Sequence, residues 1–467
     1  MSYMSKETKS IGIQIGAISF LDEGVGQVLD TVADLGAVNT IYLNSFGYDI
    51  GLGGRQIIGY PYPGHGEDSA GGYIGGYCGK PNEQYYENTS IRPARDPDCD
   101  DRDLILEVVS EAGKRGMAVH AAHIDRFSSD FPGGDQVREV NHRREQTESY
   151  CMANPDYLNF WCGLSEDVCA SYDLEGLLVF NERNGPLLSA IGATHYGVVD
   201  PRNTVCFCPH HTEIAHRSGI DVERARRAYT LLEALINDAL KGGPEAREFF
   251  TEFLALLFEY PEIAAWEKLW TDTKYEFYRG IAYRAKKGRP DVKVGFHVSH
   301  VNSFNPIYRA EWSLQRLSDI CDYLKLVVYH HAAGIRYRQF MKNLESTIFR
   351  DVPTQALFAL NSHLLGYGTM VRGEDPDETP FPPEYVYKET ARAKRLVGDS
   401  CLIYPGIGID ISHAHLEPEK PETIRAATSA ALRAGADGLI YSRKYSEMRL
   451  VNLQAAGDAV REVLNER

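Results

Sequence analysis

The sequence predicts an α/β fold, a (β/α)8 TIM barrel that forms a single catalytic domain over residues 1–467. Eight short apolar segments alternate with helical patterns or long insertions, which is typical of this barrel. The segment 177–180 is apolar on both faces, as in a strand of a parallel sheet that is covered on both sides. Polar residues also gather where the predicted strands end, and the active sites of barrel enzymes lie at those ends.

In the first half of the chain, each expected strand is a short apolar run and each expected helix shows apolar residues at helical spacing. Asp221 is an N-cap residue for the last of these helices. The strands are predicted at residues 11–20, 38–43, 117–124 and 177–180, and the helices at 25–35, 101–114, 164–171 and 221–240.

The second half repeats the alternation. A helical pattern over 244–287 is expected to break near Tyr260-Pro261, because proline interrupts a helix. The remaining strands are predicted at 292–298, 323–329, 401–409 and 438–441, and the remaining helices at 308–320, 337–348, 353–365, 384–396, 421–435 and 448–466.

Two insertions enlarge the loops that follow strands. Residues 45–100 form a Gly- and Tyr-rich insertion after the second strand, and residues 221–290 form a helical insertion after the fourth. Long loops inside a compact domain are usually functional. Tyrosine offers a flat apolar ring with a polar tip, which suits sugars. We expect a wall of stacking rings beside the cleft, with a subunit contact as the alternative, from Tyr48, Tyr60, Tyr62, Tyr73 and Tyr77.

An open doubly wound sheet is the alternative architecture. It would carry a Gly-x-Gly-x-x-Gly turn that opens a helix after an early strand. The segment Gly51-Leu-Gly-Gly does not open a helix, which favours the barrel.

Composition excludes several classes of function. The formal net charge of −16 argues against nucleic acid or an anionic membrane as a partner. The sequence has no apolar run long enough to span a membrane, and its first ten residues lack the apolar core of a signal peptide. We therefore expect a cytoplasmic protein, or a secreted one whose signal peptide has been removed. A small molecule or oligosaccharide is the expected substrate, and a homo-oligomer remains open.

The nine cysteines favour free thiols over a disulfide framework, because their number is odd and the chain is large. Cys206 and Cys208 are the closest pair, with one residue between them, whereas zinc sites usually have two to four. No metal and no cofactor are expected.

The polar residues at strand ends form the candidate site. Eight of the 15 histidines are among them, which scattered surface histidines would not produce. His120 and His123 could also be one core and one loop residue, and only one of His330 and His331 can face the cleft. The candidate substrate-binding residues are Tyr42, Asn44, His120, His123, Asp125, Asn181, Arg183, His297, His300, Tyr329, His330, Tyr404, Tyr441 and Arg443; the same strand ends carry Asn302, His331, His413, His415 and Ser442.

Asn181-Glu182 at the end of the fourth strand resembles the large clan of retaining glycoside hydrolases built on this barrel. In that clan the Glu is the acid/base, and the Asn before it binds the sugar 2-hydroxyl. The stretch from Glu175 to Leu187, with Cys206-Phe-Cys208 and the segment 219–226, also resembles barrel proteins described only as predicted glycosyl hydrolases. The resemblance therefore implies a carbohydrate-active hydrolase with Glu182 as its acid/base.

Glycoside hydrolysis needs two carboxylates across the scissile bond. In the clan the nucleophile is a Glu on strand seven, but the predicted seventh strand here has no Glu and is followed by Asp410. Asp410 is therefore the candidate nucleophile or base, with an inverting geometry or Asp125 as the partner left open. Two simple ion pairs are also open, one between Glu182 and Arg183 and one between Arg183 and Glu175.

Two other classes of function remain as alternatives. A metal-dependent sugar isomerase, epimerase or lyase could use a ligand set at the strand ends. A non-catalytic carbohydrate-binding protein could retain the barrel without turnover. A Ser or Cys nucleophile is disfavoured, because the sequence has no Gly-x-Ser-x-Gly motif and no Cys at a strand end beside a His. The metal ligands would come from His120, His123, Asp125, Glu182, His297 and Asp410.

Overall fold

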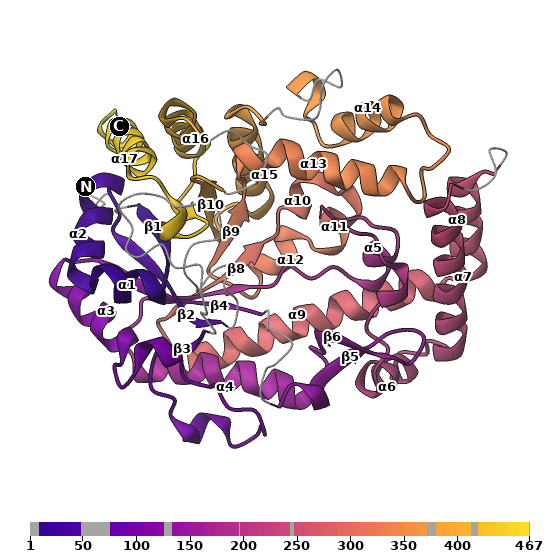
Figure 1. Ribbon diagram of the computed structural model, residues 1–467, viewed down its shortest axis with the longest axis horizontal. Coiled ribbons are helices and arrows are strands. Elements are labelled where there is room, and N and C mark those ends of the chain that lie inside the picture. Colours follow the sequence, from indigo (N-terminus) through magenta and orange to yellow (C-terminus); the bar gives the residue numbers. More distant parts are fainter. Residues whose placement is uncertain are drawn as a thin grey trace.

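Eight parallel strands close into a barrel in the computed structural model, which confirms the predicted fold class (Figure 1). The structure describes residues 9–47, 75–125, 133–195, 197–242, 247–370, 380–411 and 419–466. The first strand pairs with both the second and the last, so the sheet has no open edge along the barrel. The barrel strands are β1 (Ser10–Gly16), β2 (Thr40–Gly47), β4 (Ala118–Ile124), β7 (Gly176–Phe180), β8 (Lys293–Val298), β9 (Tyr323–Val327), β10 (Leu402–Gly408) and β11 (Gly438–Ser442).

Within the described ranges, three further strands lie outside the barrel. The two-residue strand β3 (Gly76–Tyr77) pairs antiparallel with the end of β2. A separate hairpin is formed by β5 (Arg138–Val140) and β6 (Gln146–Tyr150). This hairpin belongs to the long connection between β4 and β7, and the end of β6 contacts Arg183, the residue after Glu182.

Helices surround the strands, and each long one buries an apolar face. They are α1 (Ala17–Glu23), α2 (Val25–Gly36), α3 (Leu104–Lys114), α4 (Pro155–Ser171), α5 (Pro186–Ala190), α6 (Pro209–Arg217), α7 (Val222–Leu240), α8 (Phe249–Glu259), α9 (Glu262–Gly288), α10 (Val301–Phe304), α11 (Pro306–Glu311), α12 (Leu314–Ser318), α13 (His330–Glu345), α14 (Thr354–Leu364), α15 (Glu384–Val397), α16 (Pro421–Arg433) and α17 (Leu450–Asn465). Short 3₁₀ turns occur at Glu83–Tyr86, Pro97–Cys99, Asp135–Val137, Pro201–Asn203, Gly368–Met370 and Tyr445–Glu447.

Several element boundaries differ from the prediction. The first strand ends at Gly16, and the apolar residues after it form α1 instead of prolonging the strand. The helix predicted at 164–171 is the end of α4, which already begins after Asn154, whose side chain accepts a hydrogen bond from the Asp156 amide. The break near Tyr260-Pro261 is confirmed, since α8 ends and α9 begins there.

The N-terminal half of the barrel interior is filled by aromatic side chains. The His120 ring packs against Tyr42 and Tyr323, and Tyr323 packs against Tyr404. His120 Nδ1 lies 3.0 Å from the Tyr323 hydroxyl. Glycine faces these rings: a Cβ on Gly295 would lie 2.1 Å from the Tyr323 ring. These residues form a closed aromatic floor below the carboxyl ends of the strands.

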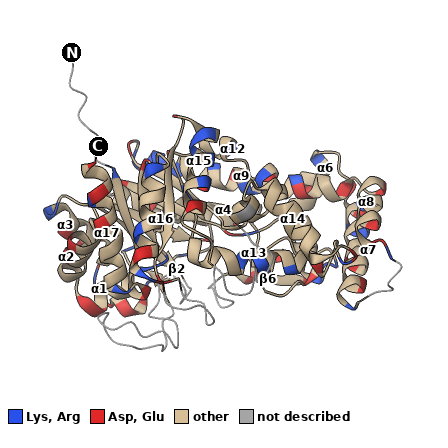
Figure 2. Ribbon diagram, turned by 90° about the horizontal axis from the view of Figure 1, so that it is seen from above, with Lys and Arg blue, Asp and Glu red and all other residues tan. Residues whose placement is uncertain are grey.

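The helices between β7 and β8 lengthen the molecule on one side. In Figures 1 and 2, α7 and α8 lie at the end opposite α2 and α17. In Figure 1, α9 runs from the α7 and α8 end past the strands and packs along α4. Acidic and basic residues are interspersed over the helices in Figure 2. Across the described ranges, we find no helix whose length and hydropathy would let it cross a bilayer.

Candidate functional site

The centre of the candidate site is Glu182, two residues after the end of β7. Its side chain retains 38% of its accessible surface, and its Oε1 lies 2.8 Å from Nε2 of His297 on β8. The His297 ring packs on Phe180, with 4.8 Å between the ring centroids. Neighbouring parallel strands thus place a carboxylate and an imidazole, both among the candidate residues, in contact at the carboxyl end of the barrel.

Lys325 on β9 lies behind His297 and was not among the predicted residues. Its Nζ donates to Gln14 Oε1 at 2.8 Å and to the Tyr329 hydroxyl at 2.9 Å, and lies 3.4 Å from Nδ1 of His297. An ammonium group only donates, so Nδ1 accepts and Nε2 carries the proton that is donated to Glu182. Burial, followed by the charge of Lys325, lowers the pKa of His297 to about 4, so the ring is neutral at pH 7.

A second carboxylate, Asp125, organises the residues on either side of Glu182. Asn181 Nδ2 donates to Asp125 Oδ2 at 2.6 Å, Arg183 Nη2 donates to Oδ1 at 2.9 Å, and Tyr157 adds a hydrogen bond. Arg183 also donates to the backbone carbonyl of Tyr150. Burial raises the pKa of Asp125, and the Arg183 charge opposes that rise. Arg183 therefore pairs with Asp125, while Glu175 pairs with Lys293.

Next to Arg183, helix α9 contributes the buried amine of Lys274. Lys274 Nζ donates to the Arg183 carbonyl at 3.0 Å and lies 4.5 Å from the centre of the Trp312 ring. Burial lowers the pKa of Lys274 to about 7. Sequence reasoning missed this residue, because a lysine in a charged helix gives no sign of facing inward.

Asp410 follows β10 in a left-handed conformation, with φ of +49°, and its carboxylate is enclosed by donors. It accepts hydrogen bonds from the Arg449 amide at 2.8 Å, from Arg449 Nε and Nη2 at 3.0 and 2.8 Å, and from Asn452 Nδ2 at 2.9 Å. The carboxylate thus lies at the N-terminus of α17, where negative charge is favourable. These contacts fit a structural ion pair, while the catalytic assignment of Asp410 stays a prediction.

Several predicted binding residues do not line the mouth of the barrel. Tyr42, His120 and Tyr404 belong to the floor. His123 faces away from the barrel interior, between Phe46 and Trp161 of α4. Tyr441 also faces outward and donates its hydroxyl to the Gly36 carbonyl at 3.1 Å. Alternate residues of a strand point to opposite faces, and these side chains take the outer face.

The other predicted residues lie around the mouth but are already engaged. His300 contacts Tyr385 and Arg336, at 3.0 and 3.1 Å. His330 opens α13 rather than ending a strand, and its Nε2 lies 2.8 Å from Glu419. Arg443 pairs with Glu447 at 2.6 Å. Asn44 and Arg443 help to line a cavity of about 10 Å³ above Tyr42, room for about one water molecule.

Part of the predicted aromatic wall lies outside the described residues: Tyr48, Tyr60, Tyr62 and Tyr73, as do His413 and His415. Tyr77 is described, and its side chain is buried in β3, so it does not present a ring to a cleft. For this residue the predicted stacking role is wrong, because pairing with β2 turns it inward.

The ligand set of the isomerase alternative is not assembled. His120 lies in the floor, His123 lies outside the barrel wall and Asp410 lies under Arg449. In the described part of the chain, one group of His, Cys, Asp and Glu side chains has the spacing of a metal site, and it is Cys151, Cys206, Cys208 and His211. The spacing of Cys206-Phe-Cys208 alone predicts no metal site, and the fold adds Cys151 and His211 to this pair.

The site and the barrel together define a class of protein: a (β/α)8 barrel with an Asn-Glu pair after its fourth strand. Solved structures with the same fold include β-galactosidases from Halorubrum lacusprofundi (TM-score 0.51, 12% identity) and from G. stearothermophilus, a GH42 enzyme solved as a catalytic mutant (0.50, 10%). They cover 97% and 99% of this chain, and this chain spans 58% of each of them.

An α-L-fucosidase isoenzyme from Paenibacillus thiaminolyticus is also similar, with a TM-score of 0.47 and 13% identity over 99% of this chain and 48% of that one. Comparison with protein-family models gives no match, and comparison with curated proteins gives none either. At these identities the two β-galactosidases show that the fold is shared. This chain spans about half of the length of the solved enzymes it matches.

Proposed function

We propose that this protein is a glycoside hydrolase that acts on a carbohydrate, with Glu182 as general acid/base. The observation that carries the proposal is the Glu182 carboxylate, which is accessible at the end of the fourth parallel strand and accepts a hydrogen bond from a neutral imidazole. Active sites of barrel enzymes lie at this face. The fold shared with β-galactosidases supports the same reaction class.

The surrounding residues have distinct parts in this proposal. The Lys325 charge behind His297 keeps the ring in the tautomer that donates to Glu182. Asp125 fixes Asn181 and Arg183, which hold the backbone on both sides of Glu182. Glu182 donates a proton to the leaving oxygen of the glycoside and later removes one from water, as required of the first of two carboxylates. The Asp410 carboxylate is enclosed by hydrogen-bond donors from Arg449 and Asn452. We therefore assign the role of the second catalytic carboxylate to no particular residue.

The test is turnover of a panel of aryl glycosides by wild type, Glu182→Gln and Glu175→Gln. Glu175 precedes β7 at the opposite end of the barrel and pairs with exposed Lys293, so it is a matched control. We expect Glu182→Gln to lose about 10²- to 10⁴-fold in kcat on substrates with poor leaving groups, and less with dinitrophenyl leaving groups that need no proton. Glu175→Gln should retain wild-type turnover.

Wild-type activity in Glu182→Gln would contradict the assignment of Glu182. Sugar binding by the folded wild type without turnover across the panel would instead favour the carbohydrate-binding alternative. Isothermal titration with monosaccharides, performed on the same preparations, separates these two outcomes.

A further inference from the structure

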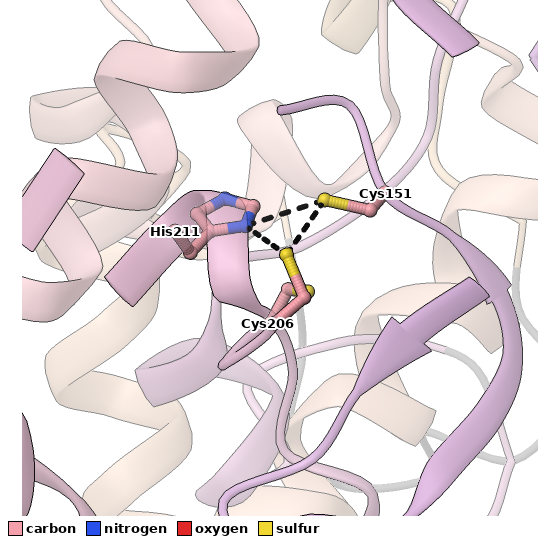
Figure 3. Close-up of side chains that lie close together, drawn as sticks. Cys151, Cys206 and His211 are labelled. Atoms are coloured by element: carbon pink, nitrogen blue, oxygen red, sulfur yellow. Dashed lines mark hydrogen bonds between the residues drawn. The ribbon is translucent and has the colours of Figure 1, made fainter. Parts of the chain in front are cut away.

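Four buried donors converge at a place that the proposed reaction does not use. Cys151 follows β6, Cys206 and Cys208 precede α6, and His211 lies in the first turn of that helix. Their donor atoms all lie within 4.8 Å of one another. Figure 3 shows the Cys151 sulfur and the His211 ring pointing toward one another, with Cys206 beside them. Segments far apart in the sequence thus present three thiols and one imidazole to a single point.

Three of the six distances among these donor atoms lie close to the edges of a coordination tetrahedron. Cys151 Sγ lies 3.3 Å from Cys208 Sγ and 3.3 Å from His211 Nδ1, and Cys208 Sγ lies 3.5 Å from the same nitrogen. With Zn–S bonds of about 2.3 Å and Zn–N bonds of about 2.0 Å, neighbouring ligand atoms of a tetrahedral zinc site lie roughly 3.5–3.8 Å apart. A small outward adjustment of the side chains would therefore accommodate the ion.

The backbone that carries these donors is fixed independently of them. The Phe207 amide donates to the Val140 carbonyl at 2.6 Å, and Arg226 donates to the Phe207 carbonyl at 2.8 Å. Trp266 donates to the Cys206 carbonyl at 3.1 Å and stacks on the Phe207 ring at 4.3 Å between centroids. Cys208 is the N-cap residue of α6, which leaves two residues before His211, a usual spacing for zinc ligands.

We propose that Cys151, Cys206, Cys208 and His211 bind one divalent ion of the zinc class in a closed, structural site. Three thiolates and an imidazole are the soft ligand set that selects zinc over magnesium or calcium. All four positions of a tetrahedron are occupied by protein, which leaves none for a substrate or water. The inference stands on these donors alone and does not depend on the glycosidase activity.

The site braces the residues beside Glu182. Cys151 is preceded by Tyr150, whose carbonyl accepts from Arg183, and followed by Met152, whose sulfur lies 3.3 Å from Asn181 Nδ2. A metal bound to Cys151 would therefore hold the segment 150–152 against both neighbours of Glu182. Its removal is expected to loosen this segment and lower the thermal stability of the whole chain, because metal affinity of a structural site contributes directly to folding.

The experiment uses the full chain expressed in zinc-containing medium and measures metal content by plasma emission spectrometry. We expect one zinc ion per chain in wild type and in Cys169→Ser, a control that removes a buried thiol of α4 outside the cluster. Cys208→Ser should bind only traces. Cobalt-loaded wild type should show the visible absorption of tetrahedral, thiolate-ligated cobalt.

A second measurement keeps the test valid if Cys208→Ser fails to fold. Wild type is treated with a chelator under native conditions, and its melting temperature and its thiols in denaturant are measured. Release of one zinc ion with a lower melting temperature, and nine titratable thiols, supports the proposal. Folded wild type that contains no metal, or that shows two thiols fewer because of a disulfide, would overturn it.

Discussion

Nε2 of His297 lies 2.8 Å from Oε1 of Glu182, and the ring is the link between the accessible carboxylate and the buried interior of the barrel. Its other nitrogen meets the Lys325 ammonium. The segment after β7 and the next two strands, β8 and β9, therefore contribute one polar group each to a continuous hydrogen-bonded row. The row ends at Gln14 on β1, which also accepts from Ser442 on β11 at 2.6 Å.

Replacement of Lys325 by Met should raise the pKa of His297 from about 4 toward its usual value, because the variant removes the positive charge that opposes protonation of the ring. Histidine NMR titration of the folded protein measures this directly. Lys293→Met, at the start of β8, is the matched control and should leave His297 unchanged. An unchanged His297 titration in Lys325→Met would show that the ammonium does not act on the ring.

We expect His123 to make the stability of the protein sensitive to acid. Burial lowers the pKa of His123 to about 3. Between about pH 6.5 and pH 3, the His123 ring is therefore protonated in the unfolded chain but neutral in the folded chain. Stability is therefore lost as the pH falls from 6.5 toward 3, on the order of 3 kcal/mol at pH 4 from this residue. His123→Leu should remove that part of the pH dependence, as measured by urea unfolding at pH 7 and pH 4.

The same substitution has an expected effect at pH 7. Within the described residues, neither ring nitrogen of His123 has a hydrogen-bond partner, and the ring packs between Phe46 and Trp161. Replacing an unsatisfied buried polar group by an apolar one should stabilise the fold by about 1 kcal/mol. Exposed His216→Leu is the control and should change neither value. Destabilisation by His123→Leu at both pH values would show that the ring is better satisfied than its contacts indicate.

Asp410→Asn distinguishes a structural from a catalytic carboxylate. The substitution removes the charge that Arg449 pairs with at the N-terminus of α17, and we expect a loss of about 2 kcal/mol in the free energy of unfolding. The folded variant should retain turnover on aryl glycosides. If stability is retained while turnover disappears, Asp410 is the nucleophile or base that its position after the seventh strand predicts.

The alternation of strands and helices was sufficient to predict the barrel, because each buried strand is a short apolar run that ends in polar residues. The same pattern placed Asn181, Glu182 and Arg183 at the end of the fourth strand. It left open which face each side chain takes: His120 and His123 are three positions apart on one strand, so one lies in the barrel and the other against α4.

Lys325 and the Cys/His cluster were missed for different reasons. Lys325 lies between Leu324 and Leu326 in an apolar run, which could have indicated a functional residue. A buried strand accommodates a charged side chain only where hydrogen-bond or ion-pair partners surround it. In the cluster, Cys151 precedes Cys208 by 57 residues, so spacing alone does not connect them. Cys208 and His211 have the usual spacing of zinc ligands. A pattern of cysteines alone does not include this pair, because one of its members is a histidine.

The aromatic floor made by Tyr42, Tyr323, Tyr404 and His120 determines how solutes reach the mouth. Within the described residues these rings fill the barrel axis, so reactant and product of the proposed reaction are expected to enter and leave at the carboxyl ends of the strands. Product that rebinds at the same carboxyl-end site is then expected to inhibit competitively with substrate. With its N-terminal half filled by these rings, the eight-stranded barrel is closed at one end and does not form a channel.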